Sequence, residues 1–137
     1  MPTTIPESHR DLIDGPVLVT VATIMPDGHP QLSVIWCSSE DDYVLINTVR
    51  GRQKAKNIDK DPRVTIMAFD PSDPYRFLEI RGTVESVTEE GAVEHIGDLA
   101  RIYTGHPGYY GHFAPAGRRQ EETRVICRVR PTRVRTD

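Results

Sequence analysis

The stretch Val17–Thr48, VLVTVATIMPDGHPQLSVIWCSSEDDYVLINT, decides the fold class of this chain. Its first part, Val17–Ile24, is nearly all β-branched or small apolar residues, which is typical of a strand covered on both faces. Pro-Asp-Gly at 26–28 supplies turn chemistry, and apolar runs follow over Gln31–Ser38 and Tyr43–Thr48. The stretch therefore predicts a meander of three antiparallel strands.

More strand patterns follow the meander. One of them alternates apolar with charged or polar residues, which predicts a strand with one face toward water or a partner. These predicted strands are Arg63–Phe69, Phe77–Val87 (the alternating one) and Arg124–Val129. Five or six short strands with a few short helices predict a mainly β fold, and they favour a closed barrel because an open sheet would leave edges that need protection.

Two segments outside the strands predict helices. Thr4 and Glu7 have the capping-box spacing around Pro6, so a short helix is expected to run to about Ile13. Thr88 is expected to cap a second helix that packs across the barrel, with acids in its first turn. Its apolar residues repeat at helical spacing. These residues are Val93, Ile96, Leu99, Ala100 and Tyr103.

Length and composition bound the kind of protein. The 137 residues, with a formal net charge of -3, fit one domain spanning 1–137. Cys37 and Cys127 lie in apolar runs without metal-ligand spacing, so we expect buried free thiols in a reducing compartment. No leader pattern opens the chain, and no run approaches the roughly 18 apolar residues of a membrane span. We therefore expect a cytoplasmic protein with neither membrane nor nucleic acid as its partner.

The segment that carries chemistry is Asn47–Asn57, NTVRGRQKAKN. A strand ends in it, and Gly51 is the natural point for the chain to turn into a short helix. Ala55 and Ile58 would give that helix one apolar contact with the barrel. The sequence thus predicts a strand, a tight turn and the start of a helix at this place.

The start of that helix carries Arg50, Arg52 and Lys54, where the helix dipole favours acids instead. An external anion would neutralise these cations, and a phosphate fits because an arginine fork holds two of its oxygens while a lysine adds a point charge. Thr48 and Asn57 would complete its shell. The alternative is that the cations are solvated charges on an exposed helix.

Several short motifs stand in a fixed order along the chain. They are Val21-Ala22-Thr23, Asp27-Gly28-x-Pro30, a second strand with Trp36, Thr48-x-Arg50-Gly51-Arg52-x-Lys54-x-x-Asn57, Asp61-Pro62, Ile80-Arg81-Gly82 and Arg128-Val129-Arg130-Pro131. Their order and spacing resemble those of the pyridoxamine phosphate oxidase-like split-barrel proteins over nearly the whole chain. More narrowly, they resemble the branch of short chains that use the deazaflavin coenzyme F420.

The resemblance implies an FMN-binding-like split β-barrel of six or so antiparallel strands, working as a homodimer with two cofactors at the subunit interface. It implies that Arg52 and Lys54 hold the cofactor phosphate and that the second strand lies along the ring, with hydrogen bonds from its backbone and from Ser33. Tyr75 or Phe77 would reach the ring site of the partner. The cofactor-binding residues so implied are Gln31, Ser33, Val34, Trp36, Thr48, Arg50, Gly51, Arg52, Lys54, Asn57 and Tyr75.

General principles predict the surroundings of Trp36 and of two histidines. Trp36 is expected in the core because it shares a strand face with Leu32 and Val34. His106 and His112 are expected to be ordinary residues of a surface loop, although the aromatic residues around them also suit a pocket lid or a proton donor.

The C-terminus carries a run of arginines. They are Arg124, Arg128, Arg130, Arg133 and Arg135. We expect them on an edge strand, where charge blocks aggregation, with the alternating apolar residues facing inward. The other interpretation is that they attract an acidic tail of the kind that coenzyme F420 carries.

Three functions follow from these patterns. The first is an F420-dependent reductase that transfers hydride to a small unsaturated or conjugated substrate, with no catalytic acid or base of its own and no metal. The second is an FMN-dependent oxidase of the pyridoxamine phosphate type, and the third is a flavin- or haem-binding carrier without turnover.

Overall fold

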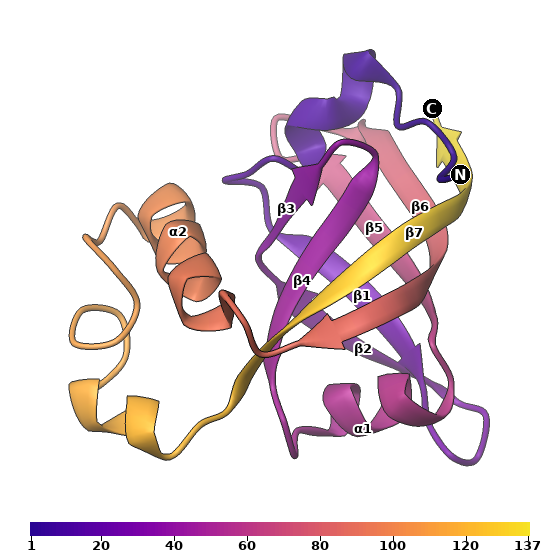
Figure 1. Ribbon diagram of the computed structural model, residues 1–137. Coiled ribbons are helices and arrows are strands. Elements are labelled where there is room, and N and C mark those ends of the chain that lie inside the picture. The colour runs from indigo at the N-terminus through magenta and orange to yellow at the C-terminus, as the bar shows by residue number, and fades with distance from the viewer.

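The computed structural model describes all of residues 1–137, and most of the chain is a single antiparallel sheet (Figure 1). The elements, with η marking 3-10 helices, are η1 (Glu7–Leu12), β1 (Val19–Ile24), β2 (Pro30–Ile35), β3 (Cys37–Glu40), β4 (Tyr43–Val49), α1 (Gln53–Lys60), β5 (Arg63–Asp70), β6 (Asp73–Thr88), α2 (Ala92–Thr104), η2 (Ala116–Gln120) and β7 (Arg124–Thr136).

The order of the seven strands explains why the sheet curls. It runs β2-β1-β5-β6-β7-β4-β3, so β2 and β3 are the two edges. These edge strands are consecutive in the chain and only Trp36 separates them. The sheet must therefore bend round until its edges meet at Trp36, and since no ladder joins β2 to β3, the barrel stays split there. The expected split barrel is confirmed, with one strand more than expected.

A core of 19 residues fills the inside of the curl. Its largest side chains, such as Ile46, Ile66 and Ile80, are fully shielded from solvent because alternate residues of each strand point inward. Cys37 and Cys127 are buried free thiols, as expected, and burial raises the pKa of Cys37 to about 12. The core lies within one curled sheet, which holds the residues around its rim in fixed positions.

Gly82 lets two long strands of the barrel touch. It pairs with Pro131, where the register between β6 and β7 shifts. A Cβ at this position would stand 2.7 Å from a methyl carbon of Val129 and 2.8 Å from the Arg130 carbonyl oxygen. Glycine is therefore required here, because any side chain would force the strands apart.

The helices cover the ends and one side of the barrel (Figure 1). α1 lies across the lower end in this view, where Ala55 and Ile58 are buried as expected. η1 lies at the upper end, and α2 stands outside the barrel against β7 and β4. Residues 105–123, which we call the arm, extend from α2 and return to the start of β7.

Some expected boundaries are wrong. The first helix is a 3-10 helix that begins after Pro6 with no side-chain cap, so Thr4 does not cap it. Thr88 ends β6, and α2 begins after Gly91. Gly91 has a φ of 76°, and no side chain caps the helix. The run Gln31–Ser38 forms two strands instead of one. Where it breaks, the Tyr103 hydroxyl accepts from the Cys37 N–H at 3.2 Å and donates to the Cys37 carbonyl at 3.1 Å.

Candidate functional site

A hollow of about 200 Å³ lies at the end of β2, where the barrel splits, beside the start of α1. We call it the aromatic hollow. Its wall is made by residues of β2, β4, α1, α2 and the arm. Its lining residues are Leu18, Val34, Ile35, Trp36, Asn47, Arg52, Lys54, Ile96, Tyr109 and Phe113. One part of this wall is aromatic and another is cationic.

The aromatic part is a cluster around Trp36. The Trp36 ring stacks on Tyr103 with centroids 5.5 Å apart and meets the edge of Phe113 at 5.0 Å. The expectation that Trp36 belongs to the core is wrong, because Leu32 and Val34, on the same side of the chain, are 66% and 65% exposed. Trp36 sits instead where the barrel splits, and it offers a planar apolar surface to the hollow.

The cationic part of the wall is made by Arg52 and Lys54. Lys54 is half-buried and makes no ion pair or side-chain hydrogen bond, with no carboxylate within 4.0 Å of its ammonium. Burial lowers the pKa of Lys54, and the charges of Arg52 and Arg124 lower it further. A cation in this position lacks a counter-charge, and an anionic ligand in the hollow would supply one.

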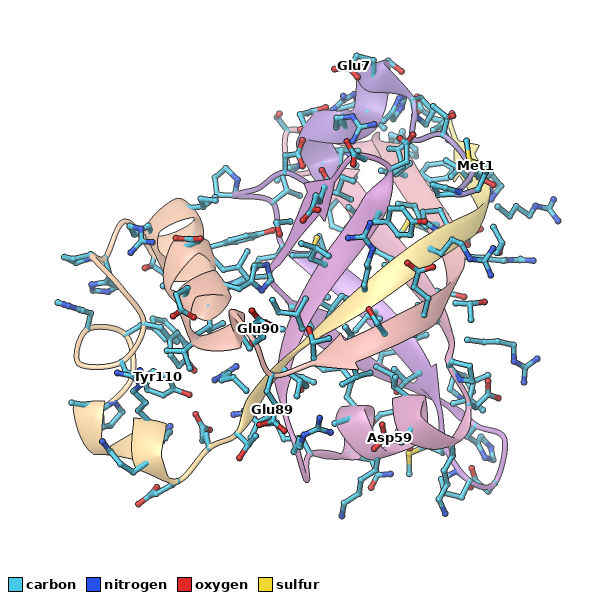
Figure 2. The ribbon with its side chains drawn as sticks, in the orientation of Figure 1. Met1, Glu7, Asp59, Glu89, Glu90 and Tyr110 are labelled. Carbon is cyan, nitrogen blue, oxygen red and sulfur yellow. The ribbon has the colours of Figure 1, made fainter.

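The other cations of this turn have partners within the chain. The Arg50 Nε donates to Glu89 at 3.1 Å, and an Arg52 guanidinium nitrogen donates to Glu122 at 3.0 Å. Figure 2 shows Glu89 at the turn between β6 and α2. The idea that all three cations await an external anion is therefore too simple, since Lys54 alone is left without a carboxylate.

Behind the cationic wall lies a buried arginine that the sequence placed only among the C-terminal arginines. The Arg124 side chain is 3% exposed; it donates to the Tyr110 hydroxyl at 3.0 Å and to the Asn47 side-chain oxygen at 3.2 Å. Glu122 balances its charge at 3.4 Å and also accepts from Tyr110 at 2.7 Å. Tyr110 lies on the arm (Figure 2), so this network fastens the arm to the barrel and holds Glu122 beside Arg52.

The same network continues into α2 through Asn47. Its side-chain nitrogen donates to the Ala92 carbonyl at 2.8 Å and lies 3.1 Å from His95 Nδ1. His95 Nδ1 must then accept, so Nε2 carries the proton and donates to the Ser38 hydroxyl at 2.9 Å. Burial lowers the pKa of His95, which agrees with a neutral ring. This arrangement fixes a tautomer that cannot take a proton from Ser38.

The structure places the expected site residues in different surroundings. Of those residues, Val34, Trp36, Arg52 and Lys54 line the aromatic hollow. Arg50 and Gly51 are exposed on the turn before α1, and Tyr75 is 87% exposed near the start of β6. Gln31 and Ser33 lie on the same face of β2 as the buried Ile35, opposite to Val34.

Thr48 and Asn57 are both buried, with 1% and 2% of their surface exposed. Thr48 Oγ1 has no hydrogen-bond partner. Asn57 donates to Thr23 Oγ1 at 3.0 Å and accepts from Gln53 at 2.8 Å. Asn57 thus ties α1 to β1, and neither side chain lines the aromatic hollow.

The arm and the C-terminal arginines also differ from expectation. Tyr109 and Phe113 line the hollow, whereas His106 and His112 are exposed. β7 is not an edge strand, since β6 and β4 flank it. Three of its other arginines pair with glutamates of β3 and β6. These pairs are Arg128 with Glu40 and Glu85, Arg130 with Glu85, and Arg135 with Glu79.

The residues that the sequence did not assign to the site come from distant parts of the chain. They are Leu18, Asn47, Ile96, Tyr109, Phe113, Glu122 and Arg124. The aromatic composition of the arm was the available signal for two of them. Arg124 looked like the first of a series of surface arginines, and its burial depends on contacts 77 residues apart.

No group of three or more His, Cys, Asp or Glu side chains is arranged to hold a metal ion. None of the helices has the length and apolar character needed to span a membrane.

A curled antiparallel sheet that splits at Trp36, with a cationic turn leading into α1, defines the split-barrel class of proteins. The chain belongs to the pyridoxamine 5'-phosphate oxidase family, whose model matches residues 5–136.

Solved structures agree with this family. The chain is 32% identical to a protein named F420 Reductase, over 96% of this chain and 98% of that chain, with a TM-score of 0.81. It is 26% identical to the conserved hypothetical protein Rv2991 from Mycobacterium tuberculosis, over 98% of this chain and 85% of that chain, with a TM-score of 0.74. General Stress Protein 26 from Bacillus anthracis shares the fold at 17% identity, over 91% and 87%, with a TM-score of 0.63. A search of curated protein sequences found no match.

Proposed function

We propose that this protein is an oxidoreductase that binds coenzyme F420 in the aromatic hollow and transfers hydride to a small unsaturated or conjugated substrate. The observation that carries the proposal is Lys54, a half-buried ammonium without a carboxylate, next to Arg52 in a hollow whose opposite wall is aromatic. A ligand that joins a phosphate to a planar ring matches both parts of this wall. The likeness to a protein named F420 Reductase supports the same cofactor.

In this proposal Arg52 and Lys54 hold the phosphate. Arg52 would exchange its bond to Glu122 for the phosphate oxygens, and Lys54 would gain the counter-charge that it lacks. Arg50 and Gly51 would support them from the turn before α1. The buried Arg124 lies too deep to line the hollow, but its charge adds to the positive potential at Lys54.

The ring would lie along the outer face of β2, next to Val34 and Trp36. Because β2 is an edge strand, one row of its backbone N–H and C=O groups has no strand partner and can bond to ring substituents. Gln31 and Ser33 would contribute through their backbone, since their side chains lie on the other side of β2. When bound, the deazaflavin ring supplies the hydride chemistry, and the protein orients it and excludes water.

The protein would act as a homodimer. Three large apolar side chains on the outer face of the barrel are exposed, with Leu18 at 58%, Leu32 at 66% and Val34 at 65%. A second copy covering this face would remove them from water and close the aromatic hollow. In this dimer Tyr75, which is 87% exposed, would contact the cofactor of the partner. The two buried thiols suit a reducing compartment such as the cytoplasm.

One experiment distinguishes this proposal from an FMN oxidase and from a carrier. We expect the purified protein to be colourless, to quench the fluorescence of added F420, and to oxidise reduced F420 in the presence of a conjugated acceptor. A yellow preparation that retains FMN and ignores F420 would support the oxidase of the pyridoxamine phosphate type. Binding of F420 without turnover of any acceptor in a wide panel would support a carrier.

A further inference from the structure

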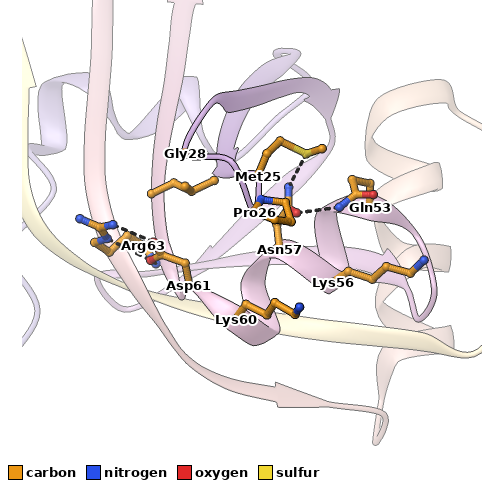
Figure 3. Close-up of a pocket in the computed structure, with 10 residues that line it drawn as sticks. Met25, Pro26, Gly28, Gln53, Lys56, Asn57, Lys60, Asp61 and Arg63 are labelled. Carbon is orange, nitrogen blue, oxygen red and sulfur yellow. Dashed lines mark hydrogen bonds and ion pairs between the residues drawn. The ribbon is translucent and has the colours of Figure 1, made fainter.

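A second hollow, of about 610 Å³, lies between the β1–β2 turn and α1 (Figure 3). We call it the hairpin hollow. Its lining residues are Ile24, Met25, Pro26, Gly28, Gln53, Lys56, Asn57, Lys60, Asp61 and Arg63. None of these residues lines the aromatic hollow, so the two are separate places that share only α1 as a neighbour.

The back of the hairpin hollow is fixed by the buried Asn57. Its side-chain nitrogen lies 3.0 Å from Thr23 Oγ1 and 3.3 Å from Met25 Sδ, and its oxygen accepts from Gln53 at 2.8 Å. Figure 3 shows Met25 and Gln53 on either side of Asn57. These bonds hold one face of α1 at a set distance from the turn, so the space between them is part of the folded structure.

The charges around this hollow are unbalanced. Lys56 and Lys60 are exposed, and neither has a carboxylate within 4.0 Å. Arg63 donates to both carboxylate oxygens of Asp61, at 2.9 and 2.7 Å, and this pairing lowers the pKa of Asp61 to about 2. Among the residues that line the hollow, three cations therefore stand against one carboxylate, in a chain whose net charge is -3.

The spacing of the two free lysines suits an extended acid. Residues four apart on a helix have Cβ atoms about 5–6 Å from each other, so the two flexible lysine side chains can contact two acidic groups of one molecule at the same time. Ile24, Met25 and Pro26 form an apolar wall beside them, where an aliphatic link between two acidic groups can pack. A volume of about 610 Å³ is in the ordinary range for a small-molecule site.

We infer that the hairpin hollow binds an acid with two or more carboxylates joined by a short aliphatic chain, held by Lys56 and Lys60. Such an acid has two possible sources. It is either a free polycarboxylic acid or an acidic chain attached to the cofactor in the aromatic hollow, and the second source rests on the function proposed above. In both cases the contacts in the hairpin hollow are the same.

Citrate is a suitable probe, since it carries three carboxylates on a short aliphatic chain. We would titrate it into the isotopically labelled protein at low ionic strength, where surface charges are least screened, and follow the backbone amide signals. We expect saturable shifts confined to the β1–β2 turn and to α1. In the Lys56→Gln/Lys60→Gln variant the dissociation constant should rise at least about tenfold.

A matched control carries the same change of charge elsewhere. The Arg81→Gln/Arg133→Gln variant loses two exposed cations far along β6 and β7, and its affinity for citrate should stay within about threefold of the original. Equal losses in both variants, or shifts scattered over every basic surface, would mean nonspecific attraction and would overturn the inference. So would the absence of saturation. Thermal unfolding of both variants checks that they are folded.

Two further measurements identify the source of the acid. If saturating F420 displaces citrate from the hairpin hollow, the acidic chain of the cofactor is the occupant; if the two bind together, the occupant is a free acid. If F420 does not bind at all, the function proposed above fails, but the citrate titration still decides whether the hairpin hollow is a site.

Discussion

The two hollows beside α1 are both basic, but they collect their charge in different ways. In the aromatic hollow, Arg52 is held by Glu122, Lys54 is half-buried, and the apolar wall comes from several distant segments. In the hairpin hollow, Lys56 and Lys60 are exposed on one helix face and need only local sequence. Under the two proposals, the first would select one ligand through its tertiary contacts, whereas the second would attract a class of ligands by charge.

The largest expected effect is the loss of cofactor binding when both cations of the aromatic hollow are neutralised. In Arg52→Gln/Lys54→Gln we expect the affinity for F420, measured by fluorescence quenching, to fall at least about 100-fold. The variant loses both the two-pronged arginine contact with the phosphate and the charge of the lysine. The affinity of the hairpin hollow for citrate should change less than about threefold. Unchanged binding of both F420 and FMN would remove the basis for the enzyme assignment.

Asn57 lies between the two hollows, and its replacement separates a structural role from a ligand role. Asn57→Leu leaves the buried Thr23 hydroxyl without its donor, so we expect the free energy of unfolding to fall by about 2 kcal/mol in urea titrations. Thr23→Val/Asn57→Leu removes both polar partners and should recover part of that loss. A stable Asn57→Leu variant with weakened cofactor binding would instead put Asn57 in the phosphate shell, as the resemblance implies.

The comparison also shows how far the sequence leads. Strands such as β4 and β5 could be predicted because their burial follows a local pattern. The break at Trp36 could not, since the apolar run continues through it and the chain parts only because the sheet curls and Tyr103, 66 residues away, bonds to Cys37.

The candidate site divides in the same way. Arg52 and Lys54 are only two positions apart in the sequence and were predicted together. The carboxylate that holds Arg52 lies 70 residues further along the chain, and the buried Arg124 meets Asn47 across 77 residues. These pairings depend on how β7 and the arm return to β4, which no local pattern records. The fold class and the cations were thus within reach of the sequence, and the partners of the cations were not.

A smaller effect concerns the unpaired charge of the aromatic hollow. Because the pKa of Lys54 is lowered in the folded state, the unfolded chain binds its proton more tightly, and the charged lysine costs stability at neutral pH. Lys54→Met should therefore raise the melting temperature by a few degrees at pH 7 while weakening the binding of F420.

The pH dependence checks the cause of that rise. The difference in melting temperature between Lys54→Met and the original protein should be constant around neutral pH. It should shrink as the pH rises toward about 10.4, the ordinary pKa of lysine, because the unfolded chain then also loses the proton. Lys56→Met, which removes a lysine from the exposed face of the same helix, is the control for the loss of one positive charge. A lower melting temperature for Lys54→Met would mean that Lys54 already has a counter-charge.

The smallest expected effect is at Thr48, whose hydroxyl is buried at the end of β4 with no partner. An unsatisfied hydroxyl costs free energy, so Thr48→Val, which keeps the shape of the side chain, should raise the free energy of unfolding by roughly 1 kcal/mol. The affinity for F420 should stay within about twofold, because no atom of Thr48 lines the aromatic hollow. A clear loss of affinity in this variant would show that β4 shifts when the anion binds and that Thr48 then joins its shell. In that case the wall between the aromatic hollow and the core would move when the ligand binds. The hairpin hollow differs, because Asn57 holds its back wall in place.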